Sequence, residues 1–318
     1  MRVRIDNDSH YIMSLLGALV VLAGISSCTP SPPQDSGRTS VVATTGIIGD
    51  VIGNVGGQSI DLSTLIPSGI DPHEYAPSAQ QVAAISSADF VFANGLGLEE
   101  NLLDLLAQSE SEGLSVTYLA DHVEPIDRDP HFWHDPIRMS RAAELIAEAL
   151  GQTSSYPAEL EQLDIEVEDL LRGIPAERRL LITGHHSFDY FADRYGFEIL
   201  ATIIPGGGSL GSPSSADLAA LIELIDRHAV PAIFVESTSS PELAEMLASE
   251  ANRPVEVVEL ASDSLGAPGS ATATYIDLVR FNARAIASAG PITRDCGADR
   301  RRRATRAETR RCGRVQTR

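Results

Sequence analysis

Short apolar runs alternate with amphipathic segments along most of this chain. The runs are rich in Val, Ile and Phe, whereas in the longer segments apolar residues recur every three or four positions. The first pattern is typical of buried strands and the second of helices with one apolar face. The pattern predicts strands at residues 40–44, 60–66, 89–93, 115–119, 180–183, 198–204, 232–235 and 255–258. It predicts helices from about residue 47 and at residues 78–87, 98–108, 136–150, 157–172, 187–194, 214–228, 241–251 and 273–289.

The alternation of strands and helices occurs twice, on either side of one amphipathic segment at residues 157–172. Such alternation predicts parallel sheets covered by helices, and a helix with a single apolar stripe is suited to join two lobes. We therefore predict an α/β fold with two (β/α)4-like lobes and one linking helix. The expected boundaries are 39–155 for the N-terminal lobe, 156–174 for the linking helix and 175–290 for the C-terminal lobe.

The N-terminus has the pattern of an export signal. Arg2 and Arg4 precede an apolar run at residues 11–25, which is of signal-peptide length and too short to span a bilayer comfortably. Small residues stand directly before Cys28, as in a bacterial lipobox, so we expect Cys28 to be lipidated. We predict a signal peptide at residues 1–27 and a disordered Pro/Ser-rich tether at 28–38. A soluble secreted protein is the alternative.

The net charge of the chain limits the kinds of molecule that it can bind. The formal net charge is −20, and the chain contains no lysine. A strongly acidic protein lacks the basic face that phosphate binding requires, so we expect no nucleic-acid partner. The last 28 residues, 291–318, carry ten arginines and almost no large apolar residue, which predicts a disordered basic tail.

Cysteine usage limits the chemistry of the predicted lobes. Besides Cys28, the chain has only Cys296 and Cys312, and both lie in the basic tail. Residues 39–290 therefore contain no cysteine, which excludes a disulfide framework and a thiolate metal site from the lobes.

The positions of the histidines in the sequence suggest a metal site. Five of the eight histidines lie in three short segments, 71–75, 129–136 and 183–188. Converging imidazoles suit a borderline divalent cation such as Zn²⁺. His73, His131 and His185 each follow an expected strand, and Asp263 follows the last one. Ligands of open parallel sheets bind outside the carboxyl ends of the strands, so these four residues, two from each lobe, are the candidate metal site.

Four further residues are expected to lie next to the candidate ligands. Trp133 is predicted to pack beneath it, and Glu236 to lie at a strand end near the interlobe cleft. His134 lies three residues beyond His131 and is either a neighbour of the ligands or an accessory ligand. His186 is adjacent to His185, and only one of two successive side chains normally reaches a given ion.

Four segments resemble those of a known family. They are Asp71 to Ser78 (DPHEYAPS), Asp129 to Pro136 (DPHFWHDP), Thr183 to Phe188 (TGHHSF) followed by Tyr195-Gly196, and Asp263 to Gly266 (DSLG). Over residues 40–289 the chain resembles the substrate-binding lipoproteins of bacterial ABC importers for zinc and manganese, of the cluster A-I type. The resemblance implies a metal held between two lobes by His73, His131, His185 and Asp263. It selects His185 over His186.

The resemblance also implies a function. We expect an extracytoplasmic receptor, anchored to the membrane by lipid, that delivers Zn²⁺ or, as the second choice, Mn²⁺ to the transmembrane subunits of an ABC permease. We expect a monomer without enzymatic activity. Three imidazoles and one carboxylate form a closed tetrahedral zinc site, and a bidentate Asp263 would suit Mn²⁺. Because binding requires neutral imidazoles, we expect affinity to weaken below roughly pH 6.

Two other functions remain open at this point. A zinc-dependent hydrolase would need an open coordination position and a general base, and the chain has no HExxH motif. A metal-binding adhesin is the other alternative, and no residue of the sequence decides it.

Overall fold

The computed structural model describes residues 37–205 and 211–289. All helices and strands below lie in one compact unit that begins at Thr39. The predicted signal peptide, the lipidation site Cys28, most of the tether and the basic tail lie outside the described residues. Within the described ranges, no helix is both long and apolar enough to cross a bilayer.

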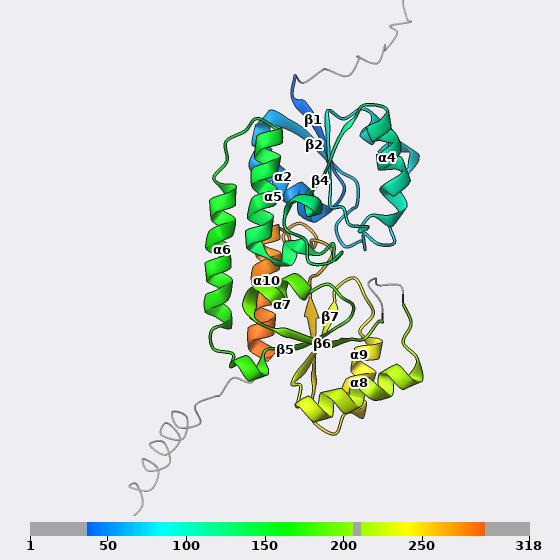
Figure 1. Cartoon of the computed structure of the whole chain (residues 1–318), viewed down its shortest axis with the longest axis vertical. Coiled ribbons are helices and arrows are strands. Elements are labelled where there is room, and N and C mark those ends of the chain that lie inside the picture. The colour runs from blue at the N-terminus through cyan, green and yellow to red at the C-terminus, as the bar shows by residue number, and fades with distance from the viewer. Residues whose placement is uncertain (1–36, 206–210, 290–318) are drawn as a thin grey trace, which may run out of the picture. The chain divides into compact units, whose positions relative to one another are not determined.

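The first lobe is built on a four-stranded parallel sheet. Its strands are β1 (Thr39–Ala43), β2 (Ile60–Thr64), β3 (Phe90–Ala93) and β4 (Ser115–Tyr118), in the order β2-β1-β3-β4. Its helices are α2 (Gly46–Gly56), α3 (Ala79–Ser86), α4 (Leu103–Ser111) and α5 (Pro136–Ala149). Figure 1 shows α2 and α5 on one side of this sheet and α4 on the other.

The core of the first lobe follows from the period of two along a strand. Val41 and Ala43 of β1 pack into the apolar cluster that includes α2 and α5. Val42, which points to the opposite face, packs with Ile85 of α3 and Leu106 of α4. The sheet is therefore covered on both faces, as its apolar strands predict.

The second lobe repeats the arrangement with two parallel strand pairs. β5 (Leu180–Thr183) pairs with β6 (Glu198–Thr202), β7 (Ala232–Glu236) pairs with β8 (Glu256–Leu260), and β5 lies next to β7. The helices are α7 (Asp189–Tyr195), α8 (Ser215–His228), α9 (Glu242–Glu250) and α10 (Tyr275–Ala289). All five residues of β7 are buried. The predicted fold class, two α/β lobes with parallel sheets, is confirmed.

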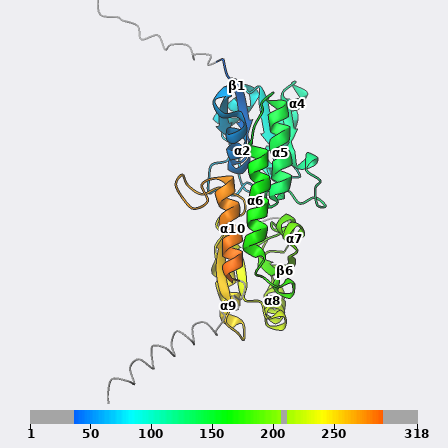
Figure 2. The same cartoon turned by 90° about the vertical axis from the view of Figure 1, so that its left-hand side faces the viewer.

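One helix, α6 (Tyr156–Leu171), packs along helices of both lobes. Figures 1 and 2 show it beside α5 of the first lobe and α10 of the second. Glu166 of α6 accepts hydrogen bonds of 3.0 and 2.9 Å from Arg280 of α10. Asp164 of α6 is buried and pairs with Arg194 of α7. The boundaries predicted for the two lobes and the linking helix stay a prediction.

Several element ends differ from the predicted ones, in one case because a side chain binds the backbone there. The helix predicted at 98–108 begins as a short 3-10 turn, and its α-helical part covers 103–111. The carboxylate of Glu99 accepts from the backbone nitrogens of Asn94 (2.7 Å) and Gly95 (3.2 Å), which holds this segment in a turn. The strands predicted at 60–66 and 198–204 end two residues earlier, at 64 and 202.

Candidate metal centre

The two Asp-Pro-His segments form the same local structure. Asp71 Oδ1 accepts a hydrogen bond of 2.8 Å from the backbone nitrogen of His73. Asp129 Oδ1 accepts one of 2.9 Å from the backbone nitrogen of His131. An aspartate that binds the backbone two residues ahead forms a turn, and the intervening proline restricts its backbone further. Each motif therefore presents its histidine from a short, ordered turn.

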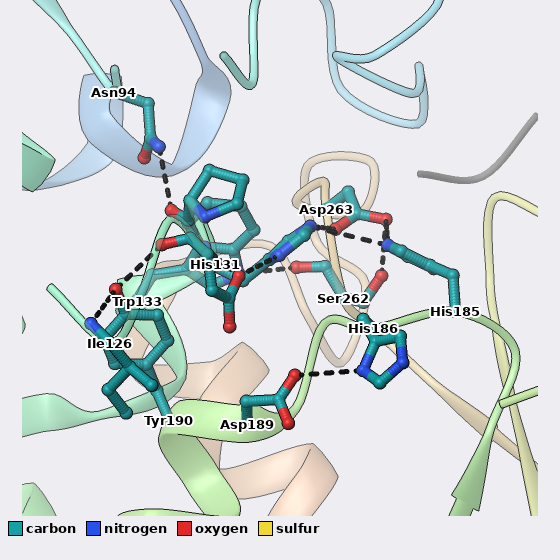
Figure 3. A network of polar contacts seen from close by, with 12 residues as sticks. Asn94, Ile126, His131, Trp133, His185, His186, Asp189, Tyr190, Ser262 and Asp263 are labelled. Carbon is teal, nitrogen blue, oxygen red and sulfur yellow. Dashed lines mark hydrogen bonds and ion pairs between the residues drawn. The ribbon is translucent and has the colours of Figure 1, made fainter. Parts of the chain in front are cut away.

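Four buried side chains converge on one point. His73, His131, His185 and Asp263 each offer an atom, and these four atoms all lie within 4.8 Å of one another. Nε2 of His131 is 3.3 Å from Nε2 of His73 and 3.4 Å from Nε2 of His185. The Asp263 carboxylate completes the group, with Oδ1 at 3.5 Å from His131 Nε2 and Oδ2 at 3.7 Å from His185 Nε2. Figure 3 shows His131 and His185 pointing at Asp263.

These separations suit tetrahedral coordination. An ion bound at about 2.0–2.1 Å by four ligands separates the ligand atoms by about 3.3–3.4 Å. The Nε2 atom of His131 already has these spacings to the nitrogens of His73 and His185, and all four side chains are at most 6% exposed. The arrangement can hold a divalent cation with three nitrogen ligands and one oxygen ligand and can exclude water from it.

His131 is held as a neutral imidazole. Its Nδ1 lies 2.5 Å from Oδ1 of Asp129, and the ring contacts the edge of Trp133 with centroids 5.1 Å apart. Burial lowers the pKa of His131 to about 3, and burial raises the pKa of Asp129 to about 7. When Nδ1–H is donated to Asp129, the lone pair of Nε2 faces the centre.

His185 has a different electrostatic setting. Its backbone nitrogen donates to Oε1 of Glu236 at 3.2 Å, and its Nδ1 lies 3.3 Å from the same oxygen. Burial lowers the pKa of His185, but the hydrogen bond with Glu236 and the charge of Asp263 outweigh it and raise the pKa to about 9. This pKa predicts that, without a bound metal ion, the imidazole of His185 is positively charged at neutral pH.

The loop of Asp263 is hydrogen-bonded to the loop of His131. Ser262 Oγ donates to Oδ2 of Asp263 at 2.6 Å. Trp133 Nε1 donates to the carbonyl oxygen of Ser262 at 2.7 Å, and Tyr275 Oη donates to the carbonyl oxygen of Trp133 at 2.7 Å. Trp133 is thus buried against His131 and also links the two lobes.

The other two histidines of the motifs point away from the cluster. The His134 ring stacks on Phe188 with centroids 4.2 Å apart, and burial lowers the pKa of His134 well below its usual value. The His186 side chain is half exposed, and its Nδ1 lies 3.3 Å from Asp189 Oδ2 (Figure 3). The structure therefore brings His185 to the centre and leaves His186 at the surface.

Sequence reasoning missed one residue of this centre as a functional group. The sequence indicates Asp129 only as part of a motif, yet its carboxylate holds both the backbone and the ring of His131. The signal was present, because an acidic residue two positions before a histidine can reach that histidine's backbone nitrogen. Its reach to Nδ1 depends on the rotamers of both side chains, which the sequence does not specify.

The chain is similar to a family of metal-binding proteins and to individual members of it. The profile of a family described as "zinc-uptake complex component A periplasmic" matches residues 41–289. The zinc-binding protein TroA of Treponema pallidum is 30% identical over 276 residues, which cover 80% of this chain and 89% of that protein. The manganese ABC transporter substrate-binding lipoprotein PsaA of Streptococcus mitis is 30% identical, covering 79% and 88%.

A solved structure agrees with these sequence matches. The periplasmic zinc-binding protein TroA of Treponema pallidum superposes with a TM-score of 0.72 at 28% sequence identity. The superposition covers 80% of this chain and all of that one. The two proteins therefore share their two-lobe fold.

Proposed function

We propose that this chain, which belongs to the family of the periplasmic component A of zinc-uptake complexes, captures a divalent transition metal ion for import. The observation that carries the proposal is the buried group of three imidazoles and one carboxylate. Zn²⁺ prefers nitrogen ligands in a closed four-coordinate site. We therefore assign the ion to His73, His131, His185 and Asp263.

Zn²⁺ is the favoured cargo and Mn²⁺ the next. Sites rich in imidazole bind zinc more tightly than manganese, whereas carboxylate oxygens suit manganese. The relatives include one named for zinc and one named for manganese. A bidentate Asp263 would add a fifth ligand atom. The site would then no longer have the tetrahedral arrangement that Zn²⁺ prefers, and Mn²⁺ would be favoured.

We propose that the receptor works outside the cytoplasm and passes its ion to an ABC permease. The related PsaA is named a lipoprotein of an ABC transporter, and the small residues before Cys28 match such processing. Lipidation at Cys28 would anchor a monomer to the membrane near the transmembrane subunits of the permease.

The position of Asp263 supports binding rather than catalysis. Catalytic zinc keeps three protein ligands and an open position for water. Here a fourth side chain reaches the centre. Replacement Asp263→Ala should lower zinc affinity strongly, measured by competition with a chelator. A hydrolase whose site is already open would not depend on Asp263 for closure, so unchanged affinity together with ester or peptide hydrolysis would favour the enzyme.

Metal analysis tests the proposal directly. We expect the protein purified without chelator to hold one zinc or manganese ion per chain by mass spectrometry, and His73→Ala to lose it. The matched control is His186→Ala, because His186 lies next to a proposed ligand yet points to solvent. The control should keep its ion. Wild-type protein that holds no ion, even after incubation with zinc, would contradict the proposal.

A further inference from the structure

Two of the histidines at the centre each have a carboxylate beside both the backbone nitrogen and Nδ1, as a short hydrogen bond to Nδ1 in His131 and as a looser ion-pair contact in His185. One oxygen of Asp129 contacts both the backbone nitrogen and Nδ1 of His131, at 2.9 and 2.5 Å. One oxygen of Glu236 contacts both the backbone nitrogen and Nδ1 of His185, at 3.2 and 3.3 Å. Asp129 is two residues from its histidine, whereas Glu236 is 51 residues away, at the end of β7.

The surroundings of Glu236 indicate that its carboxylate interacts with His185. The side chain is buried, and its Oε2 has no hydrogen-bond partner among the described residues. A buried carboxylate is costly unless it interacts with a partner, and the polar contacts of the Glu236 side chain are both to His185. Its Oε2 lies against the backbone of Gly184, where an added Cβ would be 1.8 Å away. Only glycine at position 184 leaves room for the carboxylate beside His185.

We propose that Glu236 is the positioning residue of His185 and is itself not a ligand. It accepts Nδ1–H of His185, which leaves the lone pair of Nε2 directed at the ion, and its negative charge makes the imidazole a stronger donor. Each lobe then supplies one histidine whose tautomer and ring orientation are set by its own carboxylate. This inference rests on the proposed function and extends it by naming the residue that prepares the ligand of the second lobe.

Glu236→Ala and Glu236→Gln test the role. Loss of a carboxylate that orients a metal-binding histidine typically costs 10–100-fold in affinity, and we expect a zinc affinity lowered by that factor in Glu236→Ala. Glu236→Gln should recover most of the affinity, because an amide oxygen can still accept Nδ1–H. The matched control is Glu259→Ala, which removes an exposed acidic side chain from the adjacent strand β8. The control should bind zinc as wild type does.

A spectroscopic signature separates positioning from general stability. Co²⁺ is used as a probe, because its visible absorption reports ligand geometry directly. Glu236→Ala should shift the absorption bands of the Co²⁺-loaded protein, whereas Glu236→Gln should restore them. If Glu236 only stabilised the fold, Glu236→Ala would lower the unfolding temperature of the metal-free protein and leave these bands unchanged.

Gly184→Ala provides an independent test that keeps every charge. The added methyl group must displace the Glu236 carboxylate, so Gly184→Ala should weaken zinc binding to a similar extent. In a Glu236→Ala background the same change should have little further effect, because residues that act through one contact are not additive. Two fully additive losses would overturn the proposal.

The outcomes distinguish this inference from the proposed function. If wild-type protein binds no zinc, the proposed function itself fails. If wild type binds zinc, and Glu236→Ala binds within twofold of it with an unchanged Co²⁺ spectrum, the role of Glu236 is overturned and the function stands. Should Glu236→Ala fail to fold, Gly184→Ala decides, and wild-type affinity in that variant overturns the role.

Discussion

Two histidines that face the same centre have pKa values displaced in opposite directions. Burial is the main cause that lowers the pKa of His131 to about 3, against the opposing charge of Asp263. His185 is buried as well, yet hydrogen bonding to Glu236 and the charge of Asp263 raise its pKa to about 9. The neutral His131 is ready to bind a cation, whereas His185 must first lose a proton.

This proton predicts how zinc affinity depends on pH. Below its pKa of about 9, His185 of the metal-free protein is protonated, so binding displaces one proton. Affinity should fall by about tenfold per pH unit as pH decreases from 9 through 7 to 6. Chelator competition at several pH values measures the slope, and calorimetry in buffers of different ionisation enthalpy measures the released proton.

The control for this dependence is His186→Ala, which should show the same slope, because His186 lies outside the cluster. The sequence alone predicts weakening only below roughly pH 6, from the ordinary pKa of histidine. The contacts of His185 extend the dependence to higher pH. An affinity that stays flat between pH 7 and pH 5 would contradict both versions.

At the scale of the elements, apolar periodicity predicted nearly every helix and strand, and polar side chains decided where helices begin. Ser78 and Gln81 form a capping box at the start of α3, and Ser214 and Asp217 form one at the start of α8. These caps satisfy backbone N–H groups that the first turn leaves without partners. The predicted and observed starts of both helices differ by one residue at most.

Ser214→Ala tests the contribution of a cap. Loss of the serine oxygen should lower the free energy of unfolding by about 1 kcal/mol, measured by urea denaturation. Zinc affinity should not change, because α8 contributes no residue to the centre. The neighbouring Ser215→Ala is the control, since Ser215 lies inside the helix and is not the cap. Equal destabilisation by both changes would argue against the cap.

At the scale of the whole molecule, the lobes are joined by hydrogen bonds directly behind the centre. Trp133, from the loop of His131, donates to the carbonyl oxygen of Ser262 and accepts from Tyr275 at the start of α10. Tyr190 of α7 donates to the carbonyl oxygen of Asp129 at 2.8 Å. The loop that carries His131 follows the first sheet in sequence but is held by residues of the second lobe.

Tyr275→Phe tests this connection with the loss of one oxygen atom. The carbonyl oxygen of Trp133 would lose a buried partner, so the free energy of unfolding should fall by about 1–3 kcal/mol. Zinc affinity should fall too, because the loop of His131 is then less well fixed relative to Asp263. Tyr118→Phe is the control, since its hydroxyl binds Glu110 within the first lobe. Zinc affinity equal to wild type in Tyr275→Phe would contradict a role of this bond in fixing the centre.

The sequence by itself determined the features that depend on near neighbours. Apolar periodicity determines whether a segment is a helix or a strand. An Asp-Pro-His segment determines its own turn, because aspartate and histidine are only two residues apart. The order of strands and loops then limits where these histidines can lie, since ligands bind at the carboxyl ends of parallel strands.

Only the tertiary structure decided which side chains meet and how they are oriented. His185 faces inward and His186 outward because packing sets the backbone of that turn. Glu236 reaches His185 across 51 residues, through the adjacency of β5 and β7. Trp133 reaches Ser262 across 129 residues. Local patterns carry no information on such contacts, because they form only when segments distant in the sequence have folded and packed together.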